Sequence, residues 1–147
     1  MEFNAWKNRH ALLCVAPEHV EVIARDLTDA GYEVFVADDA PQATDRMRED
    51  HMDVIVLDTQ FDGAEQGAAV VISAVSALQL AERRRLFLVQ ISPTARTLDS
   101  HAAFVSHVNL IVNAEDINDF AQTLDRAQRY FAELYRDFNK AIYQKSL

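Results

Sequence analysis

Cysteine is nearly absent from this chain of 147 residues, which has Cys14 alone. One thiol cannot form an intramolecular disulfide, and it is too few for a cysteine-rich zinc site. A chain without disulfides is typical of a reducing compartment, so we expect a cytoplasmic protein. No covalent staple is needed, because a domain of this size buries about 68–70% of the surface that its unfolded form exposes.

Glycine, long apolar runs and clustered histidines are also scarce. The three glycines, Gly31, Gly63 and Gly67, do not form a phosphate-binding loop. No apolar run approaches the roughly 18 residues of a membrane span, and the first ten residues lack the apolar core of a signal peptide, so we expect no membrane partner. His101 and His107 are six residues apart, and the other three histidines fall on different elements, so we expect no metal site and no cofactor.

Basic residues are outnumbered, since 14 Lys and Arg face 23 Asp and Glu and the formal net charge is −9. This balance argues against a nucleic-acid partner, because binding to phosphate backbones requires clustered positive charge. One basic cluster does occur, at residues 83–85. It is either the solvated end of a predicted helix, where cations meet the negative end of the helix dipole, or a docking patch for an acidic partner.

Short apolar runs alternate with segments of helical spacing along the chain. Val54 to Leu57 is apolar without interruption, which is typical of a strand buried on both faces, and Asp58 follows it at the strand end where α/β sheets bind ligands. Such alternation predicts a parallel sheet. We expect strands at residues 11–16, 32–37, 52–58, 86–91 and 108–113, and helices at residues 17–30, 42–49, 67–81, 97–105 and 114–144.

Five strands and five helices in this order, with Asp58 ending the third strand, resemble the receiver domain of bacterial two-component response regulators. The resemblance covers about residues 11–127 and rests on residues 27–34, residues 52–58 and the fifth strand running into the last helix. It implies an α/β fold, a five-stranded parallel sheet of order 2-1-3-4-5 with helices on both faces (flavodoxin-like). It also implies Mg²⁺-dependent transfer of a phosphoryl group from a histidine kinase to Asp58.

The parts that this chemistry needs are incomplete here. The acidic pair that holds Mg²⁺ in the family would follow the first strand, but the nearest polar residues are Glu18 and His19. The family's lysine after the fifth strand corresponds to Asn113, and the hydroxyl after the fourth strand corresponds to Ser92. The two losses remove positive charge from a site that must hold a dianion.

The resemblance therefore leaves two functions. We expect a degenerate receiver (a pseudo-receiver) that is not an enzyme and acts in signal transduction through contacts with a protein partner, with Asp58 marking the former phosphoacceptor position and Glu18, Ser92 and Asn113 a degenerate pocket. The alternative is a working receiver that uses Mg²⁺ and is phosphorylated on Asp58.

The chain also resembles a narrower group of divergent receiver-like modules, which follow a zinc ribbon in some bacterial proteins. This resemblance rests on residues 83–87, 97–99, 108–113 and 138–140. The cysteines of the zinc ribbon are missing from this chain.

The last predicted helix carries an apolar seam with the 3.5-residue period of coiled coils, and its second half has no part of a receiver left to cover. We expect residues 128–147 to be an extension that pairs two copies in a homodimer. The alternative is that the extension folds back onto the domain, under Phe3 and Trp6. The expected interface residues are Ile117, Phe120, Leu124, Phe131, Leu134 and Phe138.

Overall fold

The computed structural model describes residues 9–63 and 65–146, and within these ranges it describes all side chains except those of residues 65, 138, 139 and 141–146. Phe3 and Trp6 lie outside the described residues. The elements are β1 (Arg9–Cys14), α1 (Pro17–Asp29), β2 (Tyr32–Val36), α2 (Ala40–Glu49), β3 (Val54–Asp58), η2 (Phe61–Gly63), α3 (Glu65–Ser76), α4 (Leu80–Arg85), β4 (Phe87–Ser92), α5 (Ser100–Val105), β5 (Leu110–Asn113), η3 (Ala114–Asp119) and α6 (Phe120–Ser146).

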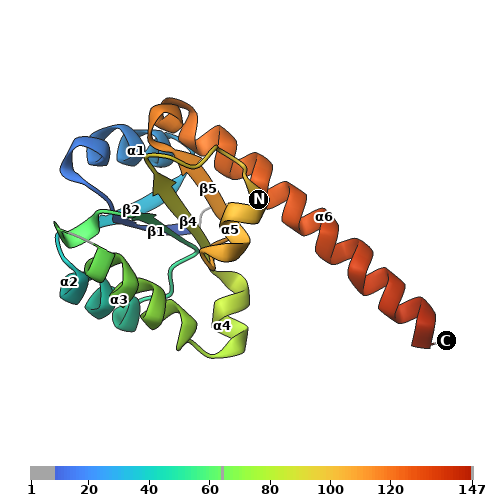
Figure 1. Ribbon diagram of the computed structural model, residues 1–147. Helices are drawn as coiled ribbons and strands as arrows, with labels where there is room; N and C mark the ends of the chain where they lie inside the picture. The colour runs from blue at the N-terminus through green and yellow to red at the C-terminus, as the bar shows by residue number, and fades with distance from the viewer. Residues whose placement is uncertain (1–8, 64, 147) are drawn as a thin grey trace.

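The five strands form one parallel sheet in the order β2-β1-β3-β4-β5. This confirms the fold class expected from the sequence. Figure 1 shows α1 and the first part of α6 on one face of the sheet, and α2 and α3 on the other. The strand order reverses between β1 and β3, and the crevice beyond their carboxyl ends is the usual ligand site of such sheets.

The sheet is buried on both faces, which explains the uninterrupted apolar run in β3. Ile55 and Leu57 point into a core closed by α2, α3 and α5, whereas Val54 and Val56 point into a second core closed by α1, η3 and α6. Alternate residues of a strand point to opposite faces, so a central strand with helices on both sides must be apolar at every position. Residue parity along β3 therefore decides which core each side chain joins.

Two predicted helices differ from the observed ones because of single backbone positions. The helix expected at residues 67–81 is split, because α3 ends at Ser76 and Gln79, which has extended dihedral angles, is the N-cap of a new helix, α4. The helix expected from residue 97 begins only at Ser100, because Leu98 has a positive φ of 66°. The Asp99 carboxylate caps α5 by accepting a hydrogen bond from Ala102 N at 3.0 Å.

The last helix is the longest element, since α6 has 27 residues and at 1.5 Å per residue spans about 40 Å. Figure 1 shows it leaving the domain as an arm. None of the helices in the described part of the chain is both long and apolar enough to cross a membrane.

Three of the six residues expected at the dimer interface are buried in the core of their own domain. Ile117, Phe120 and Leu124 are 9%, 0% and 1% exposed and belong to the core on the α1 side of the sheet. Side chains that already fill their own domain cannot contact a second copy. These three residues are therefore assigned to the core.

Candidate functional site

Asp58 is the last residue of β3 and lies at the carboxyl edge of the sheet, beside the point where the strand order reverses. It has the same parity as Val54 and Val56, so its side chain points to the face that α1 covers. The helix α1 begins at Pro17, directly beyond the end of β1. The first turn of α1 is therefore the part of the chain that faces the carboxylate.

The Asp58 carboxylate is buried and already has polar partners from two elements. His19 Nδ1 lies 3.0 Å from Asp58 Oδ2, and the backbone N–H of Ala16 donates to the same oxygen at 3.4 Å. The other oxygen, Oδ1, accepts a hydrogen bond from Gln60 N at 3.0 Å. An imidazole N–H, two amides and the positive end of the α1 dipole together stabilise a buried carboxylate that is only 5% exposed.

The side chain that the first turn of α1 brings to Asp58 is an imidazole. Mg²⁺ prefers oxygen ligands in octahedral geometry, and the first turn of α1 brings an imidazole to Asp58 instead of a second carboxylate. Glu18 is exposed in the same turn, where it complements the helix dipole. Across residues 9–63 and 65–146, no group of three His, Cys, Asp or Glu side chains has an arrangement that could hold a metal ion.

Ser92 ends β4 at the same edge, and its hydroxyl stabilises the loop that follows. Ser92 Oγ accepts hydrogen bonds from Thr94 N at 3.2 Å and from Ala95 N at 3.0 Å. The side chain is only 6% exposed. Its lone pairs are used within the loop, so the hydroxyl is a turn-forming group here.

Asn113 ends β5 and is held by the same loop. Its Nδ2 donates to Ala95 O at 2.8 Å, and its Oδ1 accepts from Glu115 N at 2.9 Å, where it caps η3. The backbone N–H of Asn113 donates to Thr97 Oγ1 at 2.9 Å. The side chain of Asn113 thus binds the loop after β4 as a donor and caps η3 as an acceptor, and a lysine could not supply the cap because it has no acceptor.

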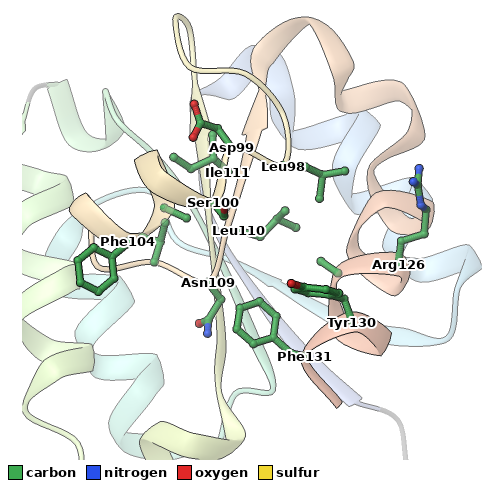
Figure 2. Close-up of a pocket in the computed structure, with 13 residues that line it drawn as sticks. Leu98, Asp99, Ser100, Phe104, Asn109, Leu110, Ile111, Arg126, Tyr130 and Phe131 are labelled. Atoms are coloured by element: carbon green, nitrogen blue, oxygen red, sulfur yellow. The ribbon is translucent and has the colours of Figure 1, made fainter. Parts of the chain in front are cut away.

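A second feature is an apolar groove of about 590 Å³ between α5 and α6 (Figure 2). Figure 2 shows Tyr130 and Phe131 on α6 facing Leu110 of β5, with Phe104 on α5 at the opposite side. The Phe131 ring packs edge-to-face on Phe87, with centroids 5.3 Å apart. Around this groove Phe104 is 80% exposed and Tyr130 60%.

The remaining expected interface residues have different positions. Phe131 is half-buried, and Leu134, one turn further along α6, is 47% exposed. The side chain of Phe138 lies outside the described residues. Leu134 is therefore the described seam residue with the most apolar surface in water.

Cys14 is fully buried in β1 beside Leu57 of β3, and burial raises the pKa of its thiol from 9.0 to about 12. At pH 8 the folded protein therefore holds about a thousandfold less thiolate than an ordinary cysteine would. We expect a disulfide reagent such as Ellman's reagent to label the native protein at least that much more slowly than the chain unfolded in guanidinium. A rapid stoichiometric reaction of the native protein would contradict the buried position.

The polar partner of Asp58 could not be singled out from spacing. Glu18 and His19 are neighbours in the sequence, and an acidic residue at a helix start is the commoner signal. The sequence does not give the orientation of α1 relative to the sheet. This orientation decides that His19, and not Glu18, faces the carboxyl edge of the sheet. A histidine in the first turn after β1, across from an aspartate at the end of β3, is the signal that would have found it.

No protein-family model matches the sequence. No curated protein matches it either. Solved structures do match. The chemotaxis response regulator CheY4 of Vibrio cholerae aligns with a TM-score of 0.62 and 16% identity over 82% of this chain and 98% of that chain.

Two further structures extend the comparison. The receiver domain of a sensor histidine kinase from Pseudomonas aeruginosa, solved with a magnesium ion in its active-site cleft, aligns with a TM-score of 0.64 and 19% identity over 85% of this chain and 98% of that chain. A fusion that carries the trimeric coiled coil of yeast Spc42, amino acids 181–211, covers 95% of this chain and 92% of its own, with a TM-score of 0.65 and 18% identity. At these identities the likeness concerns the fold. The chain has the fold of the response-regulator receiver domain.

Proposed function

We propose that this chain is a degenerate receiver-like signalling module that acts through protein contacts and does not accept a phosphoryl group on Asp58. The observation that supports this most directly is the hydrogen bond between His19 and Asp58 at 3.0 Å. The side chain that contacts Asp58 from the first turn of α1 is thus an imidazole, whereas the chemistry of the family requires a magnesium-binding acid near that carboxylate, and this supports the proposal.

The electrostatics support the same function. Phosphoryl transfer to a carboxylate develops negative charge that a divalent cation and a positive side chain must neutralise. At this edge of the sheet Asn113 and Ser92 are neutral and are bound to the loop after β4. Neither group can offer the charge that a dianionic acyl phosphate needs.

Incubation with acetyl phosphate and Mg²⁺ tests this proposal. We expect the intact mass of the protein to remain that of the unmodified chain under conditions in which a phosphorylatable receiver, run in parallel, gains a phosphoryl group. The Asp58→Asn variant is the matched control, because it removes the acceptor oxygen and keeps the shape. A stable adduct on the wild type that is absent from Asp58→Asn would establish the alternative, a Mg²⁺-dependent phosphoaccepting receiver.

The proposed contacts include a second copy of this chain. Phe104 of α5 and Tyr130 of α6 line the α5–α6 groove, and the same two helices carry Val105 and Leu134. These four apolar side chains are between 47% and 80% exposed. We define these four residues as the α5–α6 apolar face. Burying a Phe or Leu side chain contributes about 1.5–3 kcal/mol, so this face favours association, and two-fold dimers are the commonest assemblies.

The length of α6 supports the same dimer, because its second half extends beyond the domain (Figure 1). The Spc42 fusion, which covers 95% of this chain, supports self-association through a long helix, although the coiled coil in that fusion is trimeric. We propose a division into a receiver-like domain at residues 11–127 and an extension at residues 128–147 that contributes to self-association. A cytoplasmic location, the kinship with modules that follow a zinc ribbon, and function without a cofactor stay predictions of the sequence.

A further inference from the structure

A second groove, of about 650 Å³, lies at the opposite edge of the sheet from Asp58. Asp53, which precedes β3, lines this groove, whereas Asp58 ends β3, so the strand of five residues separates the two places by about 17 Å. The groove is formed where the start of β1, the end of α4, the start of β4 and the middle of α6 meet. Its charged and aromatic lining residues are Arg9, Asp53, Arg83, Arg84, Arg85, Phe87, Phe131 and Tyr135. We call it the arginine groove.

The charge of the arginine groove is opposite to that of the whole chain. Four arginines and one aspartate give its lining a formal charge of +3, in a protein whose net charge is −9. The aspartate is engaged elsewhere, because Asp53 Oδ2 accepts a hydrogen bond from His10 N at 2.8 Å and Oδ1 lies 3.4 Å from His51 Nε2. Within the part of the chain that the structure describes, no carboxylate forms a salt bridge with these arginines.

Two of the four guanidinium groups are held in place by neighbours that carry no charge. Arg83 Nη1 donates to Leu86 O at 3.0 Å, and the Arg9 guanidinium lies 4.5 Å above the centre of the Tyr32 ring. Arg84 and Arg85 are exposed in the last turn of α4. Like charges gathered in this way repel one another, so an anionic ligand would find donors that are already concentrated and partly oriented.

The other wall of the groove is aromatic. Phe87 and Phe131 pack edge-to-face with centroids 5.3 Å apart, and Tyr135, one turn further along α6, is 58% exposed. Guanidinium groups bind carboxylates with two parallel hydrogen bonds, and aromatic rings accept apolar side chains. The ligand that matches both walls combines carboxylates with an apolar residue.

We infer that the arginine groove binds an acidic segment of a partner protein, whose carboxylates contact the arginines of α4 and β1 while an apolar side chain of the segment packs on Phe131 and Tyr135. A short peptide fits better than a polynucleotide, since a net charge of −9 repels a long polyanion outside the groove. A flat anionic membrane does not complement a concave surface. The site is separate from Asp58 and shares Asn109 and Phe131 with the α5–α6 groove.

Fluorescence anisotropy with a labelled peptide tests the inference on the full chain. The probe is a seven-residue peptide of sequence EDFEELD, and its control is QNFQQLN, in which amides replace the carboxylates at nearly constant shape. We expect EDFEELD to bind at least about tenfold more tightly than QNFQQLN, and its affinity to fall as the salt is raised from about 50 to about 200 mM. Equal affinity for the two peptides, or no binding of either, would overturn the proposal.

Charge reversal locates the binding. The double variant Arg84→Glu, Arg85→Glu is expected to weaken binding of EDFEELD at least about tenfold. The matched control is Arg25→Glu, Arg48→Glu, two exposed arginines on α1 and α2 that change the net charge by the same amount and lie outside the groove. If the control weakens binding as much as the groove variant does, the effect is one of net charge and the proposal is wrong. Should the reversed variant not fold by circular dichroism, Arg84→Gln, Arg85→Gln replaces it.

Two further probes distinguish other anions. A single-stranded 20-mer oligonucleotide and vesicles containing phosphatidylserine are tested with the same variants, and binding of either one that depends on Arg84 and Arg85, without binding of EDFEELD, would overturn the peptide in favour of that ligand. A monomeric protein that binds the peptide would contradict the proposed dimer and support the arginine groove.

Discussion

Replacing Leu124 with alanine is expected to lower the free energy of unfolding by about 2–5 kcal/mol. Leu124 is 1% exposed and packs in the core between the sheet, α1 and α6. Truncation removes three carbon atoms from this core, and the rigid sheet beneath can close the resulting cavity only in part. The measurement is urea denaturation followed by circular dichroism at low protein concentration, where self-association contributes little.

Leu80→Ala is the matched control for this substitution. It makes the same chemical change in a helix, but Leu80 is 67% exposed at the start of α4 and lies outside both grooves. Its effect should stay within about 0.5 kcal/mol, as for other surface positions. If Leu124→Ala were as mild as Leu80→Ala and instead changed the oligomeric state, Leu124 would be an interface residue, as the seam alone had suggested, and its assignment to the core would be wrong.

The fold was predictable because local and global signals agree along the chain. The apolar run of β3, the strict alternation of strands and helices, and the order implied by the receiver resemblance all point to one parallel sheet. The errors occur where one residue's backbone decides the outcome. The extended Gln79 separates α4 from α3, and the positive φ of Leu98 delays α5.

The candidate site was predictable by position but not by contact. Asp58, Ser92 and Asn113 do end three neighbouring strands at one edge of the sheet, as the strand order requires. The side chain that contacts Asp58 was not predictable, because the hydrogen bond between His19 and Asp58 depends on the rotation of α1 about its axis. Likewise, Arg9 joins residues 83–85 in one groove only because β1 and α4 meet there in three dimensions.

The seam on the last helix shows a further limit of pattern reasoning. Its apolar residues recur with one period from Ile117 to Leu134, but the structure divides them by what lies beneath. The early ones cover the sheet, and Leu134 lies beyond it at 47% exposure. A period reports that a helix has an apolar face, not whether that face meets its own domain or another chain.

Replacing Leu134 with glutamate is expected to convert the dimer that we propose into a monomer. Leu134 follows Tyr130 by one turn of α6 and is 47% exposed, so a carboxylate there would add a charge to the α5–α6 apolar face. A two-fold dimer carries each substitution twice. If each copy costs about 2 kcal/mol, as for a residue at the centre of an interface, the dissociation constant rises by about a thousandfold.

Light scattering coupled to size-exclusion chromatography measures this change, with Leu80→Glu as the control that introduces the same charge on an exposed leucine outside the face. Because Leu134 fills no part of the domain core, Leu134→Glu should leave the urea midpoint of the monomer nearly unchanged, the opposite of the result for Leu124→Ala ten residues earlier on the same seam. A wild-type chain that is monomeric at high micromolar concentration would sink the dimer. If the Leu134→Glu variant is still a dimer, the dimer interface lies elsewhere on the molecule. The exposed half of α6 would then be a surface for a different partner.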